Sequence, residues 1–102
     1  IRAALDAGAE RILLGCGDSG TNDGGAGMAQ ALGIRLLDAA GSDLALGGQE
    51  LVRLDRIDFA QRDRRLDSVA IDVACNWKNV LCGEKGVARV FGPQKGADAQ
   101  TV

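Results

Sequence analysis

The side chains best suited to chemistry lie in one glycine-rich stretch, residues 15–28, which reads GCGDSGTNDGGAGM. Carboxylates, hydroxyls and an amide stand between its glycines, and such groups bind hydroxyls, coordinate metal ions or accept protons. Glycine at this density lets the main chain adopt positive φ and lets a ligand approach the backbone closely. The N–H groups that open a following helix favour anions. The stretch therefore predicts a binding loop for a small, negatively charged ligand.

The composition removes several kinds of chemistry. The chain has no histidine, and Cys16, Cys75 and Cys82 form no C-x-x-C pair, which argues against a zinc site. Without histidine, Ser–His and Cys–His nucleophiles are also excluded, so a general base must be a carboxylate or a lysine. We expect three reduced cysteines in a cytoplasmic protein.

Charge and hydropathy limit the partners. A net charge of −2 and an isoelectric point of about 4.9 argue against a nucleic-acid-binding surface. No apolar run approaches the roughly 18 residues that a membrane span needs. We therefore expect neither nucleic acid nor a membrane as partner. An unpaired sheet edge or an exposed apolar face would favour self-association, so a homodimer is a hypothesis.

The loop needs a strand before it and a helix after it. Residues 11–14 (RILL) predict a strand that carries Leu13 and Leu14 into a buried sheet. Thr21 or Asn22 is the expected N-cap of a helix that runs to about Leu32. Gly33 then ends the helix.

Further strands and helical turns follow along the chain. Residues 34–37 predict a second strand that ends at Asp38, and the alternating residues 68–74 predict another. Residues 50–54 suit one or two helical turns, whereas residues 57–66 look irregular. The alternation of strands and helices predicts an α/β fold of layered sheet and helices.

Both ends of the sequence resemble interrupted helices. Residues 1–7 read as the tail of a helix that a glycine, Gly8, ends, and residues 96–102 read as an N-cap with a first turn. We therefore expect a single partial domain over residues 1–102, truncated at both ends.

The glycines also match a dinucleotide-binding fingerprint. Gly15, Gly17 and Gly20 give G-x-G-x-x-G after a predicted strand, and Asp38 stands where the ribose hydroxyls would need an acid. Against this, Asp18 would place a negative charge in the pyrophosphate turn. An NAD(P)-type α/β module and a tight turn without ligand both stay open on the motif alone.

The longer string favours a different interpretation. GDSGTNDGGAGM at residues 17–28, with QALG at residues 30–33, resembles the bacterial glycerate kinase family, whose members carry a G-G-S-A-T-N-D-G-G-A-G-M type string. Three later segments resemble the same family in the same order: GG with LDRID (residues 47–48 and 54–58), VAC (73–75) and VFGPQKGA (90–97). The resemblance covers nearly the whole chain.

The resemblance implies ATP-dependent phosphorylation of D-glycerate to 2-phosphoglycerate, with Mg²⁺, by a kinase of two α/β domains. The chain would be a Rossmann-like central segment of that kinase, inactive alone. A non-catalytic fragment that keeps only the fold is a further alternative. No Walker A string is present, because GEKG at residues 83–86 lacks the spacing.

On this resemblance the loop binds substrate and phosphate. Ser19, Thr21 and Asn22 suit the glycerate hydroxyls, and Asp23 is expected to orient a hydroxyl or take its proton, with Mg²⁺ ligation or helix capping as its other roles. The backbone amides around the glycines suit a carboxylate or phosphate. The glycines chosen for this role are Gly17, Gly20, Gly24 and Gly25.

Four further residues complete the predicted site. Asp18 stands where family members often have glycine and suits a hydroxyl contact or an Asx-turn. Lys95, with Gln94 beside it, suits neutralisation of phosphate charge. Asn76 departs from the aspartate that many members carry after the Ala-Cys pair, so it keeps a contact and loses the charge.

Overall fold

The computed structural model describes residues 1–17, 19–75 and 78–102. In it, the glycine-rich loop follows one strand of a parallel pair. β1 (Arg11–Gly15) pairs in parallel with β4 (Ala70–Ala74), so that Arg11 lies opposite Ala70 and Gly15 opposite Ala74. Both segments are strands, as predicted. The loop therefore starts at the carboxyl end of a parallel pair, beside the end of β4.

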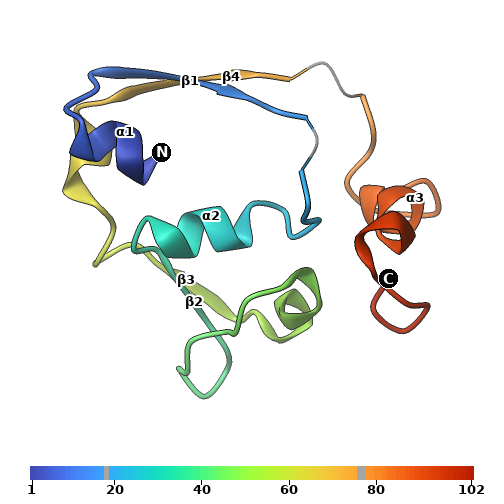
Figure 1. Ribbon diagram of the computed structural model, residues 1–102. Helices are drawn as coiled ribbons and strands as arrows, with labels where there is room; N and C mark the ends of the chain where they lie inside the picture. Colours follow the sequence, from blue (N-terminus) through green and yellow to red (C-terminus); the bar gives the residue numbers. More distant parts are fainter. Residues whose placement is uncertain (18, 76–77) are drawn as a thin grey trace.

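A second, antiparallel pair lies on the other side of α2. β2 (Arg35–Leu37) pairs with β3 (Arg56–Asp58), and α2 (Ala26–Ala31) runs between the two sheets (Figure 1). The buried core gathers mainly where α2 ends on β2. Its residues are Leu5, which belongs to α1 (Arg2–Asp6), and Leu32, Leu36, Leu37 and Leu44. The mixed arrangement confirms the predicted α/β class.

The remaining described elements are short helices. Three 3₁₀ helices span Gly48–Arg53, Arg64–Asp67 and Pro93–Lys95. α3 (Val87–Phe91) and the C-terminus lie to one side of the molecule, at the right of Figure 1. Among the described residues, no helix has the length and apolar character needed to cross a membrane.

Several predicted boundaries were wrong. α2 begins at Ala26 rather than after Thr21 or Asn22, because Gly24 and Gly25 adopt φ of 62° and 85°, which no right-handed helix contains. Residues 57–66 are not wholly irregular, since they include most of β3 and the start of a 3₁₀ helix. In contrast, the expected helix end at Gly33 is confirmed, with φ of 83°.

The sheet of β1 and β4 leaves apolar side chains exposed. Leu13, predicted to be buried, is 74% exposed, and Val73 is 58% exposed. β1 alternates exposed and half-buried residues, and every residue of β4 is exposed, so no described layer covers both faces of this two-stranded sheet. The homodimer stays a prediction, which a light-scattering mass of one chain would rule out.

Acid is expected to weaken the fold through Asp63. Hydrogen bonds from the Arg65 guanidinium, at 2.6 Å, and from the Arg65 backbone N–H lower the pKa of Asp63 from 3.8 to about 2. The folded state thus holds this proton more weakly than the unfolded chain. The stabilisation is complete above a pH of about 4 and is lost as the pH falls towards 2.

Urea unfolding at a series of acidic pH values measures this loss. Asp63→Asn should make the free energy of unfolding fall less steeply with acidity than in the unmodified protein. Glu84→Gln, at an exposed acid, is the control and should keep the original slope. An unchanged slope in Asp63→Asn would contradict the assignment.

Candidate functional site

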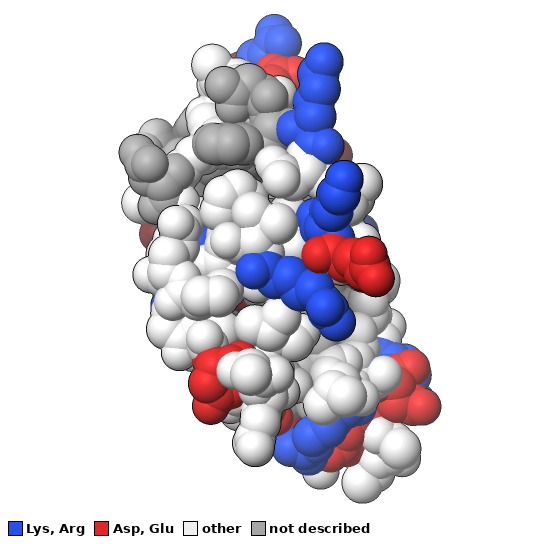
Figure 2. All heavy atoms as spheres, turned by 90° about the vertical axis from the view of Figure 1, so that its right-hand side faces the viewer, with Lys and Arg blue, Asp and Glu red and all other residues white. Residues whose placement is uncertain are grey.

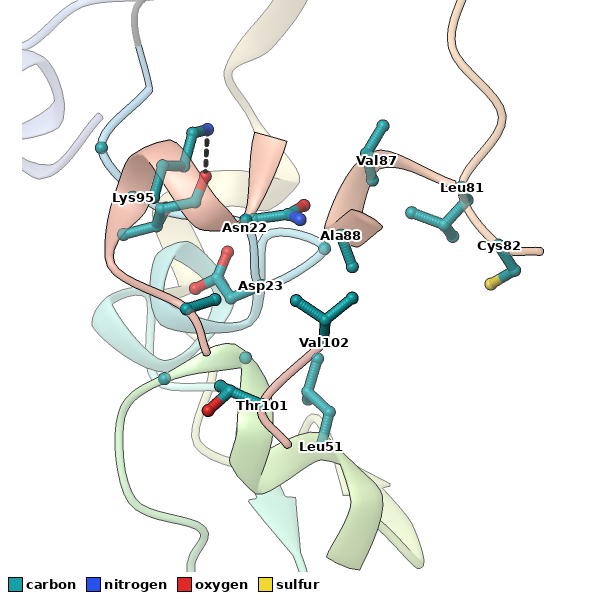
Figure 3. A pocket seen from close by; sticks show the side chains of 17 residues that line it. Asn22, Asp23, Leu51, Leu81, Cys82, Val87, Ala88, Lys95, Thr101 and Val102 are labelled. Carbon is teal, nitrogen blue, oxygen red and sulfur yellow. Dashed lines mark hydrogen bonds between the residues drawn. The ribbon is translucent and has the colours of Figure 1, made fainter. Parts of the chain in front are cut away.

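The glycine-rich loop forms one wall of a cavity of about 480 Å³. Asn22 and Asp23 lie on the loop side, Val87 and Ala88 come from α3, and Leu51 and Val102 lie below them in Figure 3. Three segments distant in the sequence therefore meet here. The lining residues are Gly20, Thr21, Asn22, Asp23, Gly24, Gly47, Gly48, Leu51, Leu81, Cys82, Val87, Ala88, Gly92, Lys95, Ala97, Thr101 and Val102.

Asp23 caps α2 from within the loop. Its Oδ1 accepts the Gly25 N–H at 3.0 Å and its Oδ2 accepts the Gly27 N–H at 2.9 Å, while the Asp23 carbonyl accepts the Ala26 N–H at 3.1 Å. The N–H groups that open the helix are thus used inside the protein. The expectation that they would face an anion was wrong, because Asp23 supplies the negative group itself.

Two other N–H donors of the loop have no acceptor in the part of the chain that the structure describes. Within the described residues, no hydrogen bond uses the N–H groups of Asn22 and Gly24, and both residues line the cavity. A ligand carboxylate or phosphate would satisfy such donors. The N–H groups predicted to bind an anion are therefore those of the turn and not those of the helix.

Ser19 and Thr21 close a small turn at the start of the loop. The Thr21 N–H donates to Ser19 Oγ at 3.3 Å, and that hydroxyl lies 3.1 Å from the Thr21 carbonyl, to which it donates. Both residues are exposed, but only Thr21 lines the cavity. Ser19 thus shapes the loop by an ST-turn.

Lys95 joins the C-terminal segment to the loop. Its Nζ donates to the Thr21 carbonyl at 2.9 Å, the dashed line in Figure 3, across 74 positions of sequence. The residue is half-buried and lines the cavity, whereas Gln94 is exposed and does not. Lys95 therefore differs from an exposed turn lysine, because it contacts the loop and lines the cavity. Its ammonium group has three donors, and this contact uses one of them.

Gly48 packs against the backbone of the loop. A Cβ at this position would lie 2.5 Å from the Asn22 carbonyl oxygen and 3.4 Å from the Asn22 carbonyl carbon. Only glycine permits this approach without a shift of the loop. The double glycine at residues 47–48 belongs to the family resemblance but was not among the predicted site residues.

The structure brings together about half of the predicted site. Six predicted residues line the cavity: Gly20, Thr21, Asn22, Asp23, Gly24 and Lys95. Four predicted residues do not line it: Gly17, Ser19, Gly25 and Gln94. Asp18 and Asn76 lie outside the described residues. The apolar wall from residues 81–102 was missed, because its short apolar segments look like ordinary core in sequence.

The cavity has few groups for a metal ion. Asp23 is the one carboxylate side chain among its described lining residues, and the described chain holds no group of three or more residues of the types Asp, Glu, Cys and His that could hold a metal. Mg²⁺ commonly takes one or two protein carboxylates and completes its shell with water and substrate phosphates. The donor set therefore fits Mg²⁺ only in company with a phosphate ligand.

The dinucleotide alternative fails on the strand order. β2 pairs with β3 and not with β1, so Asp38 does not end a strand adjacent to the loop's own strand. The Asp38 carboxylate accepts Arg53 Nη2 at 2.7 Å and the N–H groups of Ala40 and Ser42. These contacts lower the pKa of Asp38, the Ser42 bond most of all. Asp38 thus stabilises a turn and is not placed to bind a ribose.

Comparison with known proteins gives a consistent result. The sequence profile described as glycerate kinase family matches residues 1–102. The chain is 59% identical over 99 residues to a glycerate kinase of Bacillus subtilis strain 168, covering 97% of the chain and 26% of that protein. It is 52% identical over 97 residues to a glycerate 2-kinase of Escherichia coli strain K12, covering 95% and 26%.

A solved structure shows the same fold. A crystal structure assigned as a candidate glycerate kinase 2, from Salmonella typhimurium LT2, superposes with a TM-score of 0.87 at 55% identity, over 98% of this chain and 27% of that one. The chain thus spans about a quarter of the length of the curated relatives it matches. On these matches, with the family string on the wall of the cavity, the chain belongs to the glycerate kinase family.

Proposed function

We propose that the natural polypeptide carrying residues 1–102 transfers the γ-phosphoryl group of ATP to the 2-hydroxyl of D-glycerate, in the presence of Mg²⁺. The observation that carries the proposal is the family string at residues 17–28. Its residues 20–24 line a cavity, and the N–H groups of Asn22 and Gly24 have no acceptor among the described residues. The relatives named glycerate kinase and glycerate 2-kinase support the same substrate.

Different residues of the loop are proposed to bind different groups of the substrate. The N–H groups of Asn22 and Gly24 suit the glycerate carboxylate, while the Thr21 hydroxyl and the Asn22 amide suit its hydroxyls. In Figure 3 the Asn22 side chain extends from the loop towards the wall lined by Val87 and Ala88. Glycerate would therefore lie between the loop and α3.

Asp23 is the proposed orienting group and proton acceptor. Each of its carboxylate oxygens accepts one backbone N–H and keeps a further lone pair. The two backbone bonds fix the orientation of the carboxylate, which is the first requirement for a general base. Phosphoryl transfer depends mostly on such positioning and on charge neutralisation.

Positive charge accumulates on the side of the cavity that α3 forms. Residues 78–95 contain Lys78, Lys85, Arg89 and Lys95 against one acid, Glu84. Figure 2 shows Lys and Arg side chains gathered in the upper half of this face. ATP would supply the phosphoryl group and Mg²⁺ would offset its charge, so a basic face beside one carboxylate suits this pair of cofactors.

The proposal also involves the part of the relatives' length that residues 1–102 do not cover. Residues 1–102 correspond to 26–27% of the relatives' length, and we propose that they form the central part of a two-domain kinase with its site between the domains. We expect them to be inactive alone, since the described cavity holds one carboxylate side chain and one lysine.

Product analysis by NMR tests the proposed reaction. The natural full-length polypeptide is incubated with Mg-ATP and either D-glycerate or L-glycerate, and phosphorus spectra distinguish 2-phosphoglycerate from 3-phosphoglycerate. We expect 2-phosphoglycerate from the D-isomer. 3-Phosphoglycerate would overturn the choice of hydroxyl, and absence of any phosphorylated product would favour the fragment that keeps only the fold.

Loss of the Lys95 ammonium should weaken the reaction. Lys95→Ala removes a charged donor that holds the loop and faces the cavity, so kcat/KM for D-glycerate should fall roughly 10- to 100-fold, as for loss of a charged hydrogen bond. Steady-state kinetics measure the change. Lys85→Ala removes the same charge from an exposed position that does not line the cavity. Equal losses in both variants would contradict a specific role for Lys95.

A further inference from the structure

Two cysteines lie opposite each other where the parallel strands end. The β1–β4 register places Ile12 opposite Ile71 and Leu14 opposite Val73. The Cys16 N–H donates to the Ala74 carbonyl at 2.9 Å, and this bond continues the ladder by one residue. In a parallel pair, the N–H of a residue donates to a carbonyl on the partner strand. That carbonyl belongs to the residue just before the one that lies opposite the donor. Cys16 therefore lies opposite Cys75.

The two thiols also share a face and are accessible. Side chains alternate along a strand, so Cys16 follows Leu14 and Cys75 follows Val73 on the same face of the ladder. Both cysteines are free and exposed. Adjacent strands lie about 4.8 Å apart, within the roughly 4.4–6.8 Å that separates the Cα atoms of a disulfide.

We propose that Cys16 and Cys75 form a reversible intrachain disulfide when a peroxide is the oxidant. One thiolate attacks the peroxide O–O bond and becomes a sulfenic acid, with release of the first water after protonation. The second thiolate attacks that sulfur and displaces hydroxide, which leaves as the second water. The two sulfurs together lose two electrons, and the peroxide gains them.

The bond would act on the start of the binding loop. The Cβ atoms of a disulfide lie roughly 3.5–4.5 Å apart, closer than opposite positions on adjacent strands, so closure draws the carboxyl ends of β1 and β4 together. Cys16 directly precedes the stretch that reaches the cavity at Gly20. The cross-link is a covalent property of the chain and does not depend on the proposed kinase reaction.

Peptide mapping under non-reducing conditions tests the bond. Trypsin cleaves after Lys and Arg, which places the three cysteines on separate peptides, residues 12–35, 66–78 and 79–85. The natural full-length polypeptide is reduced, treated with hydrogen peroxide, alkylated and digested. We expect peptide 12–35 joined to peptide 66–78 with loss of two hydrogen atoms, reversed by dithiothreitol, and the Cys82 peptide still alkylated.

Matched variants decide between the pairings. Cys16→Ser should abolish the cross-link, and Cys82→Ser should keep it. A mixture of isotopically light and heavy protein should give no cross-link between light and heavy peptides, since the bond is intrachain. Oxidation of Cys16 or Cys75 without a cross-link, a bond to Cys82, or mixed light–heavy pairs would each overturn the proposal.

Discussion

Asp23→Asn is expected to lower kcat for D-glycerate phosphorylation by about 10²- to 10⁴-fold, the usual contribution of a positioned acid–base group. An amide accepts no proton at neutral pH, so the proposed role is lost while the shape of the side chain is kept. The amide oxygen of the variant can still accept one of the two N–H groups, from Gly25 or Gly27, that the carboxylate of Asp23 now accepts. The loss of stability should therefore be only about 1 kcal/mol.

Two measurements separate catalysis from capping. Steady-state kinetics on the natural full-length polypeptide give kcat, and thermal unfolding gives stability. Asp58→Asn is the control, because Asp58 also accepts a backbone N–H, from Ala60 at 2.8 Å, and does not line the cavity. A normal kcat in Asp23→Asn, with only a lower melting temperature, would reduce Asp23 to a helix cap.

Gly48→Ala is the second substitution with a large expected effect. The added methyl would lie 2.5 Å from the Asn22 carbonyl oxygen, so either the loop or the 3₁₀ helix Gly48–Arg53 must move. The obstructing atoms belong to the backbone of the loop, which cannot rotate aside as a flexible side chain would. A displacement of about 1 Å at a positioned group can reduce a rate about 10²-fold, and we expect a loss of kcat/KM of this size.

A matched glycine tests whether the loop is the cause. Gly15→Ala adds the same methyl in open space, at a position that has no positive φ and does not line the cavity. This control should keep kcat/KM within about twofold of the unmodified protein. If Gly48→Ala is equally active, the contact with Asn22 does not position the site.

The local part of the fold could be predicted from sequence. The apolar residues 11–14, the glycines and the helix formers that follow predict strand, loop and helix in that order, and β1 and α2 confirm it. The end of α2 at Gly33 was predicted because positive φ ends a helix locally. The family string of residues 17–28 likewise predicts that the loop binds a ligand, and that prediction awaits the kinetic tests.

The order of the strands and the burial of their side chains could not be predicted from the sequence pattern. The fingerprint of Gly15, Gly17 and Gly20 with Asp38 requires the strand before Asp38 to lie beside β1, but that strand, β2, pairs with β3 in a separate sheet. Leu13 looked like a core residue, yet no described layer covers it. Strand order and burial depend on which distant segments meet, and periodicity within one segment carries no such information.

The sequence by itself determined the family, the α/β class and the loop, because each follows from residues that are neighbours along the chain. Tertiary structure alone decided which distant segments hold the loop: Lys95 reaches the Thr21 carbonyl, and Gly48 packs on Asn22. These contacts join segments up to 74 positions apart. The physical reason is that hydrogen bonding and close packing are decided by distance in space, which only the folded chain sets.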